Sequence, residues 1–471
     1  PIDPADPEDP NDPNEEYVEL VNIGSETINL NLVKFTNGID FTFGDVALAP
    51  GEFTLVVEDV NAFEAKHGQG LPIAGQFKDR LANNGEKIEL LDAMGTLIHE
   101  FSYDDDWRKI TDDEGYSLTI IDPANPDPNS WGRKDSWRPS ASRGGSPGVD
   151  DSGILPLPGD IVFSETLAHS HDEASDWIEL YNTTDSPIRI GGWYLSDSAS
   201  NLKKYRISLW TIIGAHQYRV FHETTQFGAP SVDPGKLEPF AFSENGETVY
   251  LSSATSGELT GYRESQDFGA SATGISFGRY FKGSTGNYNF VPMSYPTMGW
   301  PNAYPKVGPV VITEISYNPD WPAEGGSYTS DQYEFIELRN TSAVAITLYR
   351  QDKAEPWKIT GGVDFTFPDA PNAATIGPGD YLIVAKKPEA FSWLYSRIPS
   401  QKILGPYDGS LSNSGERVQL SSPGDVDGQG VRQYIREDRV VYSDGAHPQD
   451  QPGNVDLWPT QADGHGFPVP D

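Results

Sequence analysis

The chain has 471 residues, more than one hydrophobic core usually organises, and its 47 glycines and 38 prolines favour many turns over long helices. Its 70 acidic and 33 basic residues give a net charge of −37, which argues against nucleic acid and anionic membranes as partners. The absence of cysteine excludes disulfides, thiolate metal sites and cysteine nucleophiles, and no apolar run is long enough for membrane insertion.

The first segment, residues 1–16, is rich in proline and carboxylates. Prolines favour an extended backbone that spaces the charges apart, which is typical of a solvated linker. Calcium binds six to eight hard oxygen ligands, so the segment is also a candidate calcium site. Its candidate ligands are Asp3, Asp6, Glu8, Asp9 and Asp12. The acidic run at residues 104–106 together with Asp112 and Asp113, and the run at 425–428, are further candidates of the same kind.

Three landmarks then recur in the same order along the chain. The first is a strand in which apolar and polar residues alternate around a glutamate, at residues 17–22, 177–182 and 335–340. The second is a turn leading into a strand, at residues 50–57, 214–221 and 378–385. The third is a Gly-Glu turn and strand, at residues 84–90, 245–251 and 414–420. Such alternation is typical of half-buried antiparallel strands.

These repeats predict an all-β chain of three tandem immunoglobulin-like β-sandwich domains. The predicted domains cover residues 1–151, 160–304 and 309–471, and short Pro/Gly linkers join them. Amphipathic patterning predicts only two short helices, over residues 60–67 and 388–395.

The two ends differ from the middle repeat. The second and third domains begin with a strand at residues 161–165 and 311–315, whereas the first domain lacks this strand and the third lacks its last strand or strands. We therefore expect the chain to be a fragment of a longer polypeptide. Alternatively, a neighbouring copy supplies the missing strand by β-strand addition and builds a head-to-tail fibre.

Several motifs can be compared with a known family. They are the strand Trp-Ile-Glu-Leu-Tyr-Asn at 177–182, Ile-Gly-Gly-Trp-Tyr-Leu-Ser-Asp at 190–197, the opening strand at 311–319 and the closing Pro-Thr-Met-Gly-Trp-Pro-Asn at 296–302. Together with the turns at 245–247 and 378–381, they resemble the bacterial lamin-tail domain family. The first and third copies lack the Gly-Trp motif and resemble a longer subtype.

The resemblance implies a compact immunoglobulin-like sandwich without catalytic activity of its own. It also implies tandem copies within a large secreted or surface protein, beside enzymes or adhesion modules. The nuclear-lamina role of eukaryotic relatives does not follow from it, because a fold does not fix a function.

The glutamate of the first landmark, present as Glu19, Glu179 and Glu337, is a candidate for acid–base chemistry. The alternative is that each carboxylate caps turn N–H groups or faces solvent. An active site seldom occurs three times in tandem, so the recurrence favours the structural role. Motifs of serine hydrolases, zinc proteases, nucleotide-binding loops and dinucleotide-binding folds are absent, and we predict no enzyme activity.

Two further groups of residues could bind ligands. His169 and His171, with a carboxylate from Asp172 or Glu173, could bind zinc or another transition metal, although loop histidines are usually solvated. Trp107, Trp131, Trp137 and Trp321 could stack on sugars, or could close the ends of the sandwiches.

The sequence therefore predicts a non-catalytic structural or adhesive segment of a large secreted or cell-surface bacterial protein, with an extracellular filament as one form that it could take. Its partners would be other copies of itself or neighbouring domains of the same polypeptide. The alternative is a carbohydrate- or matrix-binding accessory module attached to an extracellular enzyme. We expect no cofactor apart from the candidate calcium ion.

Overall fold

The computed structural model describes residues 14–171, 175–283, 286–319 and 327–445. The chain divides into two compact units. Unit 1 contains the residues up to Val162 together with Asn182–Gln217 and Tyr250–Ser265, and unit 2 contains Phe163–Tyr181, Tyr218–Val249 and the residues from Gln266 onward. The division passes through the second repeat, so its sheets are described one by one. The boundaries of the three predicted domains stay a prediction.

The first repeat contains two main sheets. One is three-stranded, in the order β1 (Tyr17–Val21), β6 (Phe53–Val57) and β7 (Ile73–Gln76). The other is four-stranded, in the order β4 (Phe41–Thr42), β3 (Lys34–Asn37), β8 (Lys87–Leu91) and β9 (Leu97–Ser102). Smaller pairs are β2 (Ile28–Asn29) with β5 (Ala47–Leu48), and β10 (Leu118–Ile120) with β11 (Trp137–Pro139).

Alternation along β6 explains why this repeat has a helix on one side of the sheet. Val56 packs into the main core together with Phe35 of β3 and Ile88 of β8. Leu55 and Val57 point to the opposite face and pack against Phe63 of α1 (Val60–His67). The Asp59 carboxylate accepts the Ala62 N–H and caps the start of this helix.

The second repeat contains a five-stranded sheet in the order β18 (Tyr218–His222), β13 (Trp177–Asn182), β12 (Ile161–Leu167), β21 (Phe277–Lys282) and β22 (Asn287–Pro292). Its four-stranded sheet has the order β16 (Tyr205–Arg206), β15 (Tyr194–Ser196), β19 (Gly246–Thr255) and β20 (Glu258–Gly269). A small pair joins β14 (Ile188–Arg189) to β17 (Ile212–Ile213).

The third repeat has the same plan as the first. A four-stranded sheet has the order β23 (Val310–Ser316), β24 (Phe335–Asn340), β31 (Tyr381–Ala385) and β32 (Ile403–Leu404). A five-stranded sheet has the order β33 (Asp408–Gly409), β29 (Val363–Thr366), β28 (Lys358–Gly361), β34 (Gly415–Val426) and β35 (Arg432–Ser443). The small pairs are β25 (Ile346–Thr347) with β30 (Thr375–Ile376), and β26 (Tyr349–Arg350) with β27 (Glu355–Pro356).

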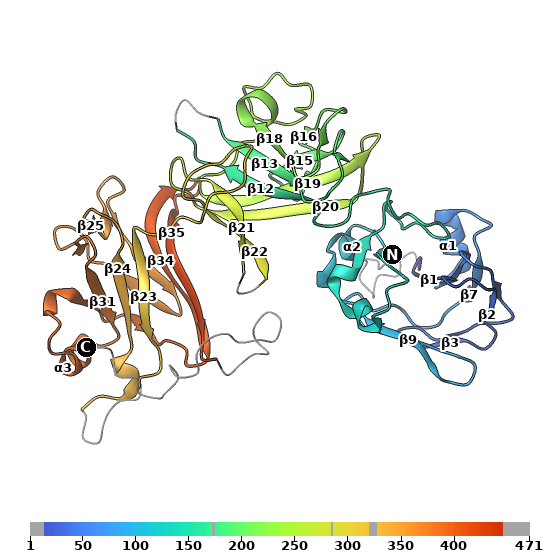
Figure 1. The fold of residues 1–471 in the computed structure, drawn as a ribbon, viewed down its shortest axis with the longest axis horizontal. Helices are drawn as coiled ribbons and strands as arrows, with labels where there is room; N and C mark the ends of the chain where they lie inside the picture. Colours follow the sequence, from blue (N-terminus) through green and yellow to red (C-terminus); the bar gives the residue numbers. More distant parts are fainter. Residues whose placement is uncertain (1–13, 172–174, 284–285, 320–326, 446–471) are drawn as a thin grey trace. The chain divides into compact units, whose positions relative to one another are not determined.

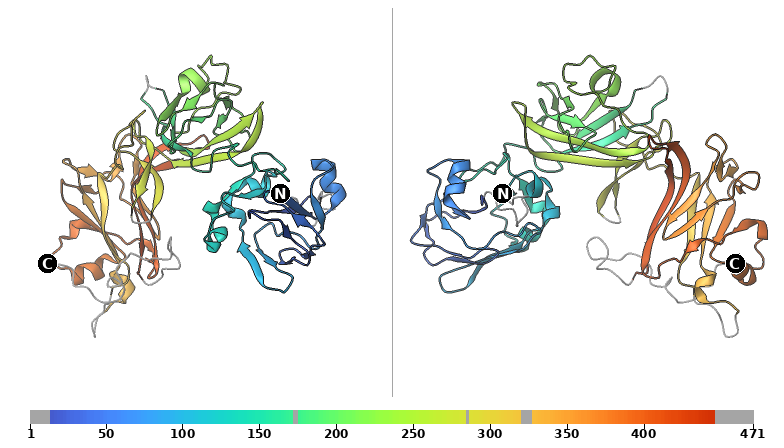
Figure 2. Two further views of the ribbon diagram at one scale, coloured as in Figure 1. Left: turned by 45° about the vertical axis from the view of Figure 1, so that its right-hand side comes forward. Right: turned by 180° about the vertical axis from the view of Figure 1, so that it is seen from behind.

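The core of the third repeat follows the same alternation. Leu382 and Val384 of β31 face the main core, while Ile383 and Ala385 pack with Phe391 of α3 (Pro388–Leu394). The hairpin of β34 and β35, orange to red in Figures 1 and 2, is the longest in the third repeat. The remaining short helical elements are η1 (Asp105–Trp107), α2 (Ile110–Asp113), η2 (Pro128–Gly132), η3 (Lys134–Ser136), η4 (Glu223–Phe227), η5 (Ser330–Tyr333) and η6 (Ser400–Lys402).

The predicted fold class is confirmed, since sheets dominate all three repeats. The predicted opening strands are β12 and β23, and the two predicted helices are α1 and α3. No helix among the described residues is long and apolar enough to cross a membrane.

Candidate functional site

The recurring glutamate is bound to backbone in two of the three repeats. A side-chain oxygen of Glu19 accepts the N–H of Gly148, and one of Glu179 accepts the N–H of Gly299. Both glycines lie in a closing turn and have positive φ values of 77° and 81°, which favours glycine there. Burial raises the pKa of Glu19 and Glu179 to about 7 in each case, because desolvation outweighs the hydrogen bond that stabilises the charged form.

Glu337 occupies the same strand position but has a different partner. Its Oε1 accepts the Thr313 hydroxyl at 2.7 Å. The neighbouring Glu314 is partly buried, and its pKa is raised by desolvation and by the charge of Glu337. The structural role predicted for these glutamates is therefore observed as turn capping in two repeats and as a side-chain contact in the third.

A second recurring carboxylate, which the sequence analysis missed, lies three residues before the first. The Glu16 carboxylate accepts the Leu81 N–H at 2.8 Å, and Asp176 accepts the Ser170 N–H at 3.0 Å. Glu334 accepts the Leu411 N–H at 3.0 Å and the Tyr407 hydroxyl at 2.8 Å. Burial raises the pKa of all three carboxyl groups, that of Glu16 to about 7. An acid three residues before each landmark glutamate was the signal that could have revealed them.

The asparagine that ends the first landmark strand is also buried in each repeat. The Asn182 side-chain amide donates to the carbonyls of Ser186, Ile213 and Gly214, and its Oδ1 accepts the Thr184 N–H. Asn22 and Asn340 make the corresponding contacts in the first and third repeats. One side chain therefore satisfies carbonyls of two separate loops, which explains its recurrence.

The Gly-Glu turn of the third landmark uses its carboxylate in the same way. Oε1 of Glu86, Glu247 and Glu416 accepts the N–H of the residue four positions earlier. In the first and third repeats a tyrosine hydroxyl, from Tyr103 or Tyr442, also donates to this carboxylate. The recurring polar residues thus hold turns and strand ends in place.

The candidate calcium ligands Asp3, Asp6, Glu8, Asp9 and Asp12 lie outside the described residues. The other acidic runs have local partners. The Asp104 carboxylate accepts the Asp106 N–H, and Oδ1 of Asp427 accepts the N–H groups of Gln429 and Val431 in the β34–β35 turn. These two aspartates hold turns, as such side chains commonly do.

The candidate aromatic residues pack on one another at the end of the first repeat. Trp131 and Trp137 meet edge to face with ring centroids 5.4 Å apart, and Trp107 and Phe101 lie against Trp137. Trp137 is buried, and its indole N–H donates to the Trp131 carbonyl. This arrangement favours the packing role over sugar stacking. Trp321 lies outside the described residues.

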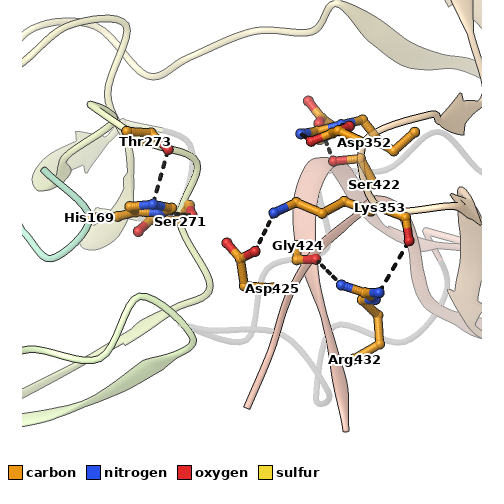
Figure 3. Close-up of polar contacts among 11 residues, drawn as sticks. His169, Ser271, Thr273, Asp352, Lys353, Ser422, Gly424, Asp425 and Arg432 are labelled. Atoms are coloured by element: carbon orange, nitrogen blue, oxygen red, sulfur yellow. Dashed lines mark hydrogen bonds and ion pairs between the residues drawn. The ribbon is translucent and has the colours of Figure 1, made fainter. Parts of the chain in front are cut away.

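His169 lies in a polar hollow of about 370 Å³ in unit 2. The hollow is lined by Ala168, His169, Ser170, Asp176, Phe242, Ser243, Glu244 and Asn245. His169 Nδ1 is 3.0 Å from the Ser271 carbonyl oxygen, and Nε2 is 3.0 Å from the Thr273 hydroxyl (Figure 3). Glu244 Oε2 lies 3.5 Å from Nε2. Of the residues 169–173 predicted to bind a metal together, Asp172 and Glu173 lie outside the described residues.

Among the described residues, one group of three potential metal ligands has donor atoms within 4.8 Å of one another. Its members are His169, Glu244 and Asp425, and all three are partly buried. The group takes one residue from each of two candidate regions that the sequence analysis had treated separately. Glu244, which joins them, was not singled out because it directly precedes the third landmark and does not recur in the other repeats.

Comparison with known families agrees with the geometry of the repeats. A family model described as Lamin Tail Domain matches residues 4–105 and 156–265. No curated protein matches the chain closely enough to be compared with it. The third predicted copy lies beyond both matched segments and rests on the landmarks that it shares with them. The two matched segments, one after the other, therefore belong to the lamin tail domain family.

Proposed function

We propose that the chain is a non-catalytic structural or adhesive segment of a larger bacterial protein that is secreted or displayed on the cell surface. The observation that carries this proposal is the use of the recurring polar side chains. The buried carboxylates and asparagines accept from or donate to backbone groups, as Glu179 does with Gly299 and Asn182 with Ile213. The recurring carboxylates and asparagines therefore stabilise the fold, as expected of a module that is used several times for mechanical or spacing purposes.

Contacts between the first and second repeats support a spacing role. Within unit 1, the Gly261 N–H of strand β20 donates to the Ala141 carbonyl at 3.1 Å. The Tyr116 hydroxyl donates to the Leu259 carbonyl at 3.0 Å, and Arg263 forms an ion pair with Glu114 at 2.8 Å. These contacts join residues 114–116 and 141 of the first repeat to strand β20 of the second, which restricts bending at this junction.

The linker between the second and third repeats is also held. Within unit 2, the Lys306 ammonium group contacts Glu437 of β35 at 3.0 Å and donates to the Gly308 carbonyl. The Ser422 hydroxyl donates to the other oxygen of Glu437 at 2.6 Å. A linker fixed by a partly buried ion pair supports a semi-rigid string rather than freely jointed modules.

The proposal can be tested by pulling the chain from its two ends in a single-molecule force experiment. A spacing module should resist force and unfold in separate events, one for each repeat. A repeat of the length of residues 160–304 should release about 500 Å of extended chain. Gradual extension at low force, without discrete events, would contradict a mechanical role.

Exposed aromatic side chains favour one alternative, a carbohydrate-binding accessory module. Tyr295, Trp300 and Tyr304, which follow strand β22, are 62%, 73% and 77% exposed. Aromatic faces of this kind can stack on sugar rings. Retention of the chain on cellulose, chitin or xylan, lost in Trp300→Ala but kept in Trp210→Ala, would favour this function. Trp210 is the matched control, because it is 81% exposed and lies elsewhere in the second repeat.

A further inference from the structure

Three segments of unit 2 bring potential metal ligands to one place. His169 follows strand β12, Glu244 precedes strand β19, and Asp425 lies near the end of strand β34 in the third repeat. Their donor atoms lie within 4.8 Å of one another. Zinc ligands at about 2.0–2.2 Å in a tetrahedral arrangement lie roughly 3.3–3.6 Å apart. The 3.5 Å between His169 Nε2 and Glu244 Oε2 already meets that spacing.

The imidazole of His169 is oriented as a metal ligand requires. The Ser271 carbonyl oxygen can only accept, so Nδ1 of His169 carries the proton, and the lone pair lies on Nε2. Nε2 lies 3.5 Å from Glu244 Oε2 and 3.0 Å from the Thr273 hydroxyl, and a metal ion bound to Nε2 would displace the Thr273 contact. Histidine ligands in metal sites commonly donate their other N–H to a backbone carbonyl in this way, which fixes the ring and its tautomer.

The third ligand is held by a cation that a metal ion could replace. Asp425 forms an ion pair with the Lys353 ammonium group (Figure 3). Arg432 donates to the carbonyls of Gly424 and Lys353, at 3.0 Å and 3.2 Å, and so fixes the backbone on both sides of this pair. The Lys353 ammonium group places one positive charge beside Asp425. A divalent ion at the same place would supply two positive charges. Lys353 is thus a competitor of the ion.

We propose that His169, Glu244 and Asp425 form a binding site for a divalent transition metal ion of the Zn²⁺ class. One imidazole and two carboxylates suit zinc or a similar ion, with water completing the coordination from the open side of the hollow. Calcium fits poorly, because it requires six to eight oxygen ligands. The bound ion would join the β34–β35 hairpin to the loops that flank β12 and β19.

The test is a titration of the full chain with Zn²⁺ by calorimetry, and with Co²⁺ by visible absorption. We expect one ion per chain at this site, and an intense Co²⁺ absorption band typical of low coordination number. His169→Ala and Glu244→Gln should each weaken Zn²⁺ binding about tenfold or more. Lys353→Gln should strengthen it, because the competing ammonium group is removed; a purely structural role of these residues would not produce this opposite sign.

His216→Ala is the matched control. His216 Nε2 lies 2.8 Å from Asp185, but that pair is not part of a group of three ligands among the described residues. Thermal unfolding with a chelator present checks that every variant is folded. If wild-type protein binds no Zn²⁺, or if His169→Ala and His216→Ala weaken binding equally, the proposal is wrong. The experiment does not depend on the spacing role, so it can fail without that role failing.

Discussion

At the scale of single residues, buried carboxylates are the feature that the repeats share most clearly. Glu179 has no exposed surface, and its hydrogen bond from Gly299 does not compensate for the loss of water around the charge. The carboxyl group therefore takes up a proton near pH 7 in the folded chain, whereas in the unfolded chain it does so near pH 4.5. Glu19 has the same shift for the same reason.

This shift predicts how stability depends on pH. Between pH 4.5 and 7 the folded state binds more protons than the unfolded state, so the contribution of Glu179 to stability is present at low pH and is lost as the pH rises through about 7. The loss amounts to about 3 kcal/mol. We expect Glu179→Gln to remove this dependence, so that the variant gains stability relative to wild type between pH 5 and pH 8.

Urea denaturation at several pH values measures the difference between wild type and variant. Glu258→Gln serves as the control, because the Glu258 side chain is 89% exposed. A wild-type-to-variant difference that stays constant from pH 5 to pH 8 would show that Glu179 does not titrate in this range.

At the scale of strands and helices, the elements predicted best from the sequence are those with a regular pattern of apolar and polar residues. The strands β1, β13 and β24 follow from one pattern, and α1 and α3 follow from short amphipathic runs. The parallel strands β7 and β32 could not be predicted in the same way. Residues 73–76 read Ile-Ala-Gly-Gln, which lacks alternation, and β32 has only two residues. Their pairing with β6 and β31 depends on the helix that precedes each of them.

The candidate metal site shows the same limit. The sequence analysis identified His169 and Asp425 as members of two separate candidate segments. Their proximity depends on how strands far apart in the sequence are arranged. The partners of the glutamates could be predicted only as a class, turn N–H groups, since Gly148 lies 129 residues from Glu19. The type of contact that a residue makes can be predicted from the local sequence. Its partner on a distant strand can be identified only once the fold is known.

The junction at strand β20 gives a prediction at this scale. A Cβ on Gly261 would lie 1.8 Å from the Ser140 carbonyl oxygen, so Gly261→Ala must displace the backbone of residues 140–141. The Gly261 N–H would then lose its acceptor, Ala141. We expect amide hydrogen exchange at residues 137–141 and 259–263 to accelerate about tenfold or more.

Gly269→Ala is the matched control, because it lies on the same strand and its Cβ would meet nothing within 4 Å. Equal exchange rates in the two variants would mean that close packing at Gly261 does not hold the junction together.

At the scale of the whole molecule, the net charge of −37 dominates the behaviour of the chain in solution. Mutual repulsion of this size opposes the association of copies and the compactness of each folded repeat, and dissolved salt screens it over about 10 Å at 0.1 M. The same charge attracts cations, which is why general screening must be separated from binding at a defined site. The five carboxylates Asp3, Asp6, Glu8, Asp9 and Asp12 could attract cations in either way, and prolines separate all of them along the chain except Glu8 and Asp9.

We expect the unfolding midpoint to rise by a few degrees when NaCl increases from about 10 to 150 mM. MgCl₂ and CaCl₂ at equal ionic strength should raise it by similar amounts, because prolines between the carboxylates hinder their convergence on one ion.

Replacing the five residues by Asn or Gln removes five negative charges and should reduce the salt dependence of the midpoint. The shifts caused by Mg²⁺ and Ca²⁺ should remain similar to each other in this variant. A larger effect of Ca²⁺ than of Mg²⁺, lost in the fivefold variant, would instead establish a calcium site in this segment. Scanning calorimetry with a chelator-treated sample distinguishes these outcomes, since the chelator removes any transition metal bound at His169.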